Sequence, residues 1–332
     1  MSLRVLQVGL GPIGIGIARR AHGSVGLRLV GAVDPKDGLP GRDLGEVLGV
    51  GTLGVAIYDS IGAALEQLRP DAALHATGSH LEGVAGQLIE LVSAGVAVVS
   101  TCEELSYPFH RHPALSRRLD ALARESGVAL LGTGVNPGFV MDKLVVTLLA
   151  ACDEVRRVRV RRVLDAARRR EPFQRKVGGG LSPAGFESRR RAGTLGHVGL
   201  VESALMLADA IGIHAPRTVR ETLAPVIAER AVRSEFLRVE PGQVAGIDQT
   251  AAIEAEGEER VRMELRMFLG APRSEDAVTI EGKPRLELAI STGVPGDEAT
   301  AAIVVHCAPL LPALAPGLRT MLDVPLRPAA WS

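Results

Sequence analysis

A glycine-rich turn near the start of the chain constrains the fold more than any other feature. Gly9, Gly11 and Gly14 follow a short apolar strand pattern and precede a helical pattern. This spacing lets the backbone turn tightly and approach a pyrophosphate at the helix N-terminus. Asp34 comes 20 residues after Gly14, where a βαβ unit places a carboxylate for ribose hydroxyls. The pattern predicts a dinucleotide-binding unit; the alternative is a glycine-rich turn that binds no nucleotide.

The same turn bears on the choice of dinucleotide. Pro12 and Ile13 complete it and are expected to contact the cofactor together with the glycines. Asp34 favours NAD, because a carboxylate repels the 2′-phosphate of NADP. Lys36 lies two residues later and would partly offset that repulsion, so use of NADP stays open.

Strand and helix patterns alternate through the first 140 residues. Strand patterns occupy residues 27–33, 72–76, 96–99 and 128–131, and helical patterns occupy residues 60–69, 77–94 and 113–126. The strands are apolar along their length, which is typical of a parallel sheet covered on both faces. We predict a doubly wound α/β sheet, the Rossmann fold, for residues 1–140, with a C-terminal helix within residues 297–332 packing back on it.

The pattern changes near residue 153. Residues 155–163 partly alternate apolar residues with Arg, residues 171–182 are predicted as a loop, and residues 197–211 as an apolar helix. Residues 225–290 hold several strand-like segments with few helical signals between them. We predict a second α+β domain with a mixed sheet over residues 141–296, which binds substrate and forms a homodimer.

Composition excludes several classes of function. The 332 residues suffice for two domains, and 38 bases balance 38 acids, which argues against nucleic acid or an acidic membrane as partner. Three widely spaced cysteines make neither a disulfide framework nor a metal site, and no metal is expected. With no leader pattern and no apolar stretch of membrane-spanning length, a cytoplasmic protein is expected. The bases are unevenly spread, since residues 151–191 hold 13 bases and 5 acids.

Polar side chains follow three of the predicted parallel strands, at the edge where open α/β sheets bind ligands. The first two groups are expected to line the cofactor: Ala76, Thr77 and Gly78, then Thr101 and Cys102. Asn136, in the third group, is expected to contact cofactor and substrate, and Phe139 the substrate. The alternatives are a helix cap at Ser79, a structural His80 and turn chemistry before Pro137.

Glu103 and Glu104 are the best acid–base candidates. They follow a buried strand where the nicotinamide is expected, and an apolar pocket would raise the pKa of a carboxylate toward neutrality. We expect one to face the pocket and the other to play a structural part. The alternative is a solvated loop carboxylate, or one stabilised by a helix dipole.

The second domain offers four candidates for substrate binding, namely Arg162, Asp165, Phe173 and His197. Asp165 would suit an ammonium group and Arg162 a carboxylate. The alternatives are surface ion pairs for these two, core packing for Phe173 and a helix cap for His197.

Five segments are recognisable together: GLGPIG (9–14), HATGSH (75–80), STCEELSYP (100–108), GTGVNPGF (132–139) with Met141-Asp142, and GHVGL (196–200) with Glu202-Ser203. They resemble the 2,4-diaminopentanoate dehydrogenase family, which includes the native amine dehydrogenases and is similar in fold to dihydrodipicolinate reductase. The resemblance implies NAD(P)-dependent oxidative deamination of an amine, either 2,4-diaminopentanoate or a simple alkyl amine, to a ketone and ammonia, and the reverse reductive amination. It implies that the catalytic carboxylate lies in the Thr-Cys-Glu-Glu segment, where we favour Glu104 over Glu103. We expect this glutamate to take a proton from the water that attacks the iminium.

Two rival functions stay open. A dihydrodipicolinate reductase-like enzyme would carry a loop rich in His and Lys, which the chain does not show. A non-catalytic nucleotide-sensing regulator would expose the basic segment 151–191 on one face. The alternative is that its arginines lie on the solvent side of a strand and pair with acids elsewhere in the chain.

Overall fold

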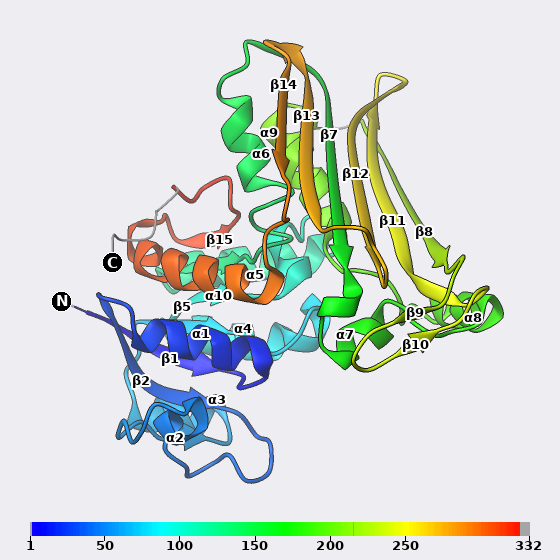
Figure 1. The fold of residues 1–332 in the computed structure, drawn as a ribbon. Helices are drawn as coiled ribbons and strands as arrows, with labels where there is room; N and C mark the ends of the chain where they lie inside the picture. The colour runs from blue at the N-terminus through cyan, green and yellow to red at the C-terminus, as the bar shows by residue number, and fades with distance from the viewer. Residues whose placement is uncertain (1, 215, 326–332) are drawn as a thin grey trace. The chain divides into compact units, whose positions relative to one another are not determined.

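The computed structural model describes residues 2–214 and 216–325, which divide into two compact units (Figure 1). Unit 1 contains the chain up to Phe139 and again from Pro295 onward, and unit 2 contains Val140–Val294. Unit 1 is therefore built from both ends of the described chain, and unit 2 lies between them in sequence.

Unit 1 contains a seven-stranded parallel sheet in the order β15-β6-β5-β4-β1-β2-β3. The strands are β1 (Leu3–Val8), β2 (Leu27–Val33), β3 (Ile57–Tyr58), β4 (Ala72–His75), β5 (Ala97–Ser100), β6 (Ala129–Gly132) and β15 (Gly317–Arg319). The helices are α1 (Pro12–His22), α2 (Leu44–Leu48), α3 (Ile61–Gln67), α4 (Leu81–Ser93), α5 (Pro113–Glu125) and α10 (Gly296–Cys307), with short 3-10 turns η1 (Glu103–Ser106) and η3 (Ala308–Ala313). The chain order reverses between β1 and β4, which is the switch point where such sheets bind ligands. The predicted doubly wound sheet is confirmed.

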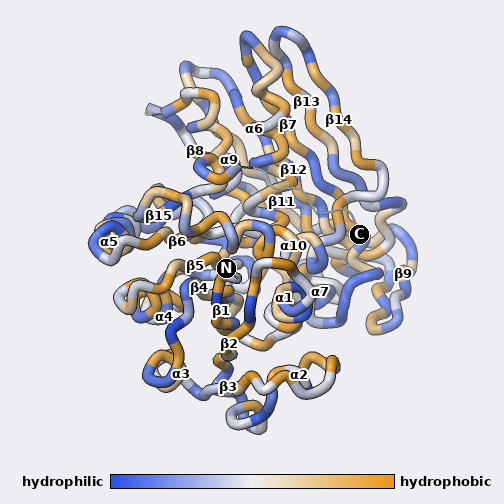
Figure 2. Tube along the Cα trace, turned by 90° about the vertical axis from the view of Figure 1, so that its left-hand side faces the viewer, coloured by the Kyte–Doolittle hydropathy of each residue, from blue (hydrophilic) through white to orange (hydrophobic). Residues whose placement is uncertain are grey.

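Apolar burial and local capping explain these elements. All four residues of β4, β5 and β6 are buried, and the tube in Figure 2 runs hydrophobic along β4 and β5. Proline stands in the first turn of α1 and of α5, where its missing N–H costs no hydrogen bond. Ser60 starts α3 by accepting a hydrogen bond from the backbone N–H of Ala63.

The helix predicted within residues 297–332 is present, but it does not occupy the whole of this segment. Helix α10 ends at Cys307, and Pro312 lies inside the 3-10 turn that follows. Proline cannot continue an α-helix, because it lacks a backbone donor. Strand β15 then pairs in parallel with β6, and residues 326–332 lie outside the described residues. Helix α10 lies beside α1 within unit 1, as Figure 1 shows.

Unit 2 contains a six-stranded mixed sheet in the order β14-β13-β7-β12-β11-β8. Its strands are β7 (Glu154–Asp165), β8 (Thr218–Ile227), β11 (Val244–Ala255), β12 (Glu258–Phe268), β13 (Glu275–Lys283) and β14 (Leu286–Ile290); β9 (Val232–Arg233) and β10 (Arg238–Val239) form a separate ribbon. Its helical segments are α6 (Lys143–Leu149), η2 (Ala166–Arg168), α7 (Glu171–Lys176), α8 (Pro183–Arg191) and α9 (Leu200–Ala210). Strands β7 and β12 are parallel and the other neighbours in this sheet are antiparallel, which confirms the predicted mixed sheet.

Two local predictions in unit 2 were wrong. Residues 171–182 are not wholly a loop, because α7 occupies their first half and Pro172 lies in its first turn, where proline is well suited. The apolar helix begins at Leu200 and not at His197. Its N-cap is Gly199, whose φ of 102° belongs to the left-handed region that glycine tolerates.

Candidate active site

The glycine turn after β1 has room for a ligand on one side only. A Cβ atom added to Gly14 would lie 1.9 Å from the carbonyl oxygen of Gly9, and one added to Gly9 would lie 2.4 Å from that of Ala76. A Cβ atom added to Gly11 would meet nothing within 4 Å. Gly9 and Gly14 are therefore required by the fold. Gly11 instead leaves open the backbone that a pyrophosphate would approach.

Asp34 is fixed beside this turn. Its Oδ2 accepts a hydrogen bond of 2.7 Å from the backbone N–H of Leu10, and its Oδ1 accepts one of 2.9 Å from that of Lys36. The structure thus brings Asp34 to the glycine turn, as a site for a dinucleotide requires. The open Gly11 and this carboxylate fit the dinucleotide that the sequence predicts.

A buried histidine supports the next loop. His75, at the end of β4, is fully buried; its Nδ1 lies 2.8 Å from Ser100 Oγ and its Nε2 lies 2.8 Å from Gln87 Oε1. The hydroxyl of Thr77 donates to the same Gln87 oxygen at 2.6 Å. Burial lowers the pKa of His75 to about 4, against the opposing effect of the Gln87 hydrogen bond, so the ring is neutral. This network holds Thr77, a predicted cofactor contact, at the ligand edge of the sheet.

The sequence did not single out His75 or Ser100 as a pair. The available signal was two polar residues ending two otherwise apolar strands, and the sheet register places them opposite each other. Cys102 has a structural role as well: its Sγ lies 3.3 Å from the carbonyl oxygen of Ser79. Burial raises the pKa of Cys102 to about 12, so the thiol is un-ionised and does not act as a nucleophile near neutral pH.

Glu104 carries the most constrained carboxylate of this edge. It lies in η1 and is 6% exposed. Its Oε2 accepts hydrogen bonds from the backbone N–H of Leu81 at 2.7 Å and from Nε2 of His112 at 2.9 Å. Its Oε1 accepts one from Nδ1 of His80 at 3.1 Å, and Nε of Arg111 lies 3.9 Å from the same oxygen.

These donors overturn the expected raised pKa. Burial pushes the pKa of Glu104 upward, but the hydrogen bonds from Leu81, His80 and His112 prevail and hold it below the usual value. Glu104 is therefore a fixed anion near neutral pH. Glu103, its neighbour in η1, is only half-buried.

Glu104 also replaces the helix cap that was considered for Ser79. The N-cap residue of α4 is His80, and its own side chain caps nothing. The Glu104 carboxylate instead accepts the N–H of Leu81, the first residue of the helix. The positive end of the helix dipole consequently adds to the stabilisation of this anion.

The loop after β6 contains the remaining unit 1 candidates. Asn136 is 9% exposed and Phe139 is half-buried. The backbone N–H of Val135 donates to Thr300 Oγ1 at 3.1 Å, which ties the loop to α10. Gly138 has a φ of 128°, and an added Cβ would lie 2.4 Å from the nitrogen of Gly134. The tight glycine turn is therefore what positions Asn136 and Phe139.

The four candidates of unit 2 have structural partners within that unit. Arg162 is 2% exposed and donates to both oxygens of Asp276 at 2.8 and 3.0 Å and to the carbonyl of Val294 at 2.7 Å. The surface ion pair considered for it is thus a buried one. Burial raises the pKa of Asp276, and Arg162 opposes that effect.

The other three candidates, Asp165, Phe173 and His197, also have contacts within unit 2. Asp165 caps η2 by accepting from the N–H of Ala167 at 3.1 Å, and its Oδ2 lies 3.5 Å from Nε of Arg168. The guanidinium of Arg169 lies 5.0 Å from the ring centre of Phe173. His197 is held through its backbone, whose N–H donates to Gln249 Oε1 at 2.7 Å. It is not the N-cap of α9.

Several arginines of the basic segment 151–191 form ion pairs. Arg157 lies 3.7 Å from Glu281 of β13, Arg161 pairs with Glu275 of the same strand, and Glu187 accepts from two arginines of α8. The described residues contain no cluster of His, Cys, Asp and Glu that could hold a metal ion. In the same part of the chain, no helix is both long and apolar enough to cross a membrane.

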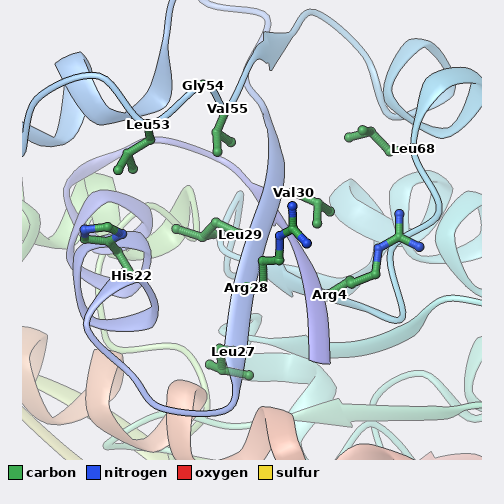
Figure 3. A pocket seen from close by; sticks show the side chains of 10 residues that line it. All are labelled: Arg4, His22, Leu27, Arg28, Leu29, Val30, Leu53, Gly54, Val55 and Leu68. Atoms are coloured by element: carbon green, nitrogen blue, oxygen red, sulfur yellow. The ribbon is translucent and has the colours of Figure 1, made fainter. Parts of the chain in front are cut away.

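A cavity of about 590 Å³ lies elsewhere in unit 1 (Figure 3). It is lined by Arg4, His22, Leu27, Arg28, Leu29, Val30, Leu53, Gly54, Val55 and Leu68. Arg4 and Leu27 stand at the beginnings of β1 and β2, opposite the strand ends that carry the glycine turn and Asp34. Because doubly wound sheets bind ligands beyond the carboxyl ends of their strands, this cavity is not the dinucleotide site.

Comparison with known proteins assigns the family. Residues 139–332 match the 2,4-diaminopentanoate dehydrogenase C-terminal domain. The chain is 31% identical over 345 residues to a 2,4-diaminopentanoate dehydrogenase of Acetoanaerobium sticklandii, covering 98% of this chain and 94% of that protein. An amine dehydrogenase structure from Mycobacterium smegmatis superposes with a TM-score of 0.85 at 29% identity, covering 99% and 98% of the two chains.

A dihydrodipicolinate reductase structure from Paenisporosarcina shares the fold at a TM-score of 0.55 and 13% identity, covering 97% of this chain and 99% of that one. The predicted resemblance is therefore confirmed at the level of family and of fold. The chain belongs to the 2,4-diaminopentanoate dehydrogenase family and is an oxidoreductase with a dihydrodipicolinate reductase-like fold.

Proposed function

We propose that this chain catalyses the NAD(P)-dependent oxidative deamination of an amine to a ketone and ammonia, and the reverse reductive amination. The substrate is 2,4-diaminopentanoate or a simple alkyl amine. The observation that carries the proposal is the buried, ionised carboxylate of Glu104 just beyond β5, at the sheet edge where the cofactor is expected. The names of the similar proteins, a diaminopentanoate dehydrogenase and an amine dehydrogenase, support it.

The glycine turn and Asp34 would hold the dinucleotide. The open backbone at Gly11 suits the pyrophosphate, and the fixed Asp34 carboxylate suits ribose hydroxyls, which favours NAD over NADP. Thr77, held by His75 and Gln87, borders the same edge. When bound, the nicotinamide supplies the acceptor for the hydrogen and electron pair that leave the amine carbon.

Glu104 supplies fixed negative charge. Its low pKa keeps it ionised across the neutral range, so it attracts the substrate ammonium and stabilises the cationic iminium that follows. Preorganised charge of this kind typically contributes about 100- to 1,000-fold in rate. Asn136 and Phe139, fixed by the glycine loop after β6, are the proposed substrate contacts from the same unit.

A spectrophotometric screen tests the reaction. The purified protein, NAD or NADP, and a panel of amines that includes 2,4-diaminopentanoate would be followed at the absorbance of the reduced cofactor. We expect reduction of the cofactor with at least one amine. Turnover of dicarboxylic dihydropyridines without any turnover of amines would contradict the proposal.

A matched pair of variants tests the carboxylate. Glu104→Gln should abolish turnover while NADH binding, measured by fluorescence, is preserved. Glu103→Gln should retain most of the activity. The opposite pattern, with near-full activity in Glu104→Gln and loss in Glu103→Gln, would exchange the two roles.

A further inference from the structure

His80 combines an exposed ring with a fixed orientation. It is the N-cap residue of α4, yet its side chain makes no cap hydrogen bond. Its side chain is 66% exposed, whereas that of Glu104 is 7% exposed. The Nδ1–H of His80 donates to Glu104 Oε1 at 3.1 Å, and the carboxylate has no proton to give in return. In its neutral form the ring is therefore held in the tautomer whose Nε2 carries a lone pair.

The partner of His80 is itself fixed from two other elements. Leu81 of α4 donates its backbone N–H to Glu104 Oε2, and His112, just before α5, donates from Nε2 to the same oxygen. His112 is nearly buried, with a side-chain exposure of 12%, and its Nδ1 lies 3.7 Å from Glu82. Arg111 adds positive charge 3.9 Å from Oε1. A carboxylate with these neighbours stays ionised and cannot readily accept a proton.

We propose that His80 is the catalytic proton acceptor and donor of the deamination, that Glu104 orients it in addition to supplying the negative charge, and that His112 is a positioning residue behind Glu104. This inference rests on the proposed function and deepens it. The arrangement follows the general logic in which a buried carboxylate orients an imidazole and stabilises its protonated form, while the far ring nitrogen meets the substrate. It moves the proton-transfer role from Glu104, for which the sequence suggested it, to the exposed ring that Glu104 holds.

The step balances as follows. Water adds to the iminium carbon: a C–O bond forms, the C=N π electrons move to nitrogen, and one water proton passes to Nε2 of His80. The imidazolium then returns this proton to the amino nitrogen of the carbinolamine. The C–N bond breaks, and the remaining hydroxyl proton leaves with the ammonia. Iminium and water thereby become ketone and ammonium, and His80 regains its starting state.

Two substitutions at His80 separate chemistry from structure. His80→Asn places an amide nitrogen near the position of Nδ1, so it can keep the bond to Glu104 but has no equivalent of Nε2. His80→Ala removes both. We expect kcat for amine oxidation to fall by about 100-fold or more in each variant, with little change in the melting temperature or in NADH affinity. Added imidazole should restore activity to His80→Ala. The control is His110→Ala, an exposed histidine of the neighbouring loop, which should behave as the wild type.

A second measurement needs neither substrate nor cofactor. Nitrogen-15 chemical shifts of neutral imidazoles distinguish protonated from bare ring nitrogens. The wild type should show His80 protonated at Nδ1, and Glu104→Gln should lose that preference while His110 is unaffected.

The outcomes distinguish the two proposals. No amine oxidation by the wild type, with His80 still protonated at Nδ1, would refute the proposed function alone. An active wild type with His80→Asn or His80→Ala within about threefold of its kcat would overturn the role of His80, because general acid–base catalysis is worth far more than that. A large loss in His80→Ala that imidazole fails to restore would also count against it.

Discussion

The neutral His75 makes the stability of unit 1 depend on pH in a defined window. Its pKa lies at about 4 in the folded protein, because burial disfavours the charged ring, against 6.5 for an ordinary histidine. At pH values between these two, His75 is protonated in the unfolded chain but not in the folded one. The contribution of neutral His75 to the unfolding free energy is therefore fully present above pH 6.5 and is lost as the pH falls toward 4.

The magnitude follows from the same two values. At about 1.4 kcal/mol per pKa unit, the interval from 6.5 to about 4 corresponds to about 3 kcal/mol of unfolding free energy. Between pH 7 and pH 5 the wild type should lose about 2 kcal/mol through this group. That loss is a substantial part of the stability of a typical domain.

The assay compares urea unfolding of the wild type and His75→Gln by circular dichroism at pH 7 and pH 5. Glutamine can accept from Ser100 and donate to Gln87, but it does not titrate. Subtracting the variant cancels the other groups that titrate, and the control His22→Gln changes an exposed histidine. If His75→Gln loses stability between the two pH values as steeply as the wild type, the reasoning is refuted.

Three further predictions concern the cofactor turn and unit 2. Gly14→Ala should destabilise the protein by about 1–3 kcal/mol in urea unfolding, because its methyl group meets a backbone oxygen of the turn, whereas Gly11→Ala should keep its stability and lose NADH affinity. Equal stabilities of the two variants would contradict this account. Asp34→Ser should raise the NADP-to-NAD ratio of kcat/KM about tenfold, and an unchanged ratio would show that Asp34 does not set the preference. Arg162→Met should lower the unfolding free energy by about 3–5 kcal/mol by leaving Asp276 buried without its partner, and Arg162→Met with Asp276→Leu should recover much of that; equal losses in both variants would argue against the pair.

Local signals predicted those parts of the site that local geometry determines. The glycine turn, Asp34 and the position of Glu104 after a buried strand follow from residues adjacent in sequence. The lowered pKa of Glu104 does not follow from adjacent residues, because its hydrogen-bond donors are residues 80, 81 and 112, which lie on two other segments. From the sequence alone, a carboxylate after an apolar strand is expected to be desolvated and to have a raised pKa, because those donors are distant in sequence.

Pairing between distant segments explains the other differences. The alternation of β7 is visible in the sequence and in Figure 2, but it does not reveal that Arg162 falls on a buried position. That position is tolerated because Asp276, on the neighbouring strand β13, stands opposite it in the register. Strand β15 has three residues, too few for a periodic signal, and exists through its pairing with β6.

The pairing of β15 with β6 also orders events during synthesis. On a ribosome, β6 is complete about 185 residues before its last partner emerges, and the whole of unit 2 is made in between. Until then the edge of β6 is an unpaired strand edge, open to pairing with other chains. Unit 2, a continuous segment, is free to fold as soon as it has been made. Unit 1 is thus begun before unit 2 and completed after it.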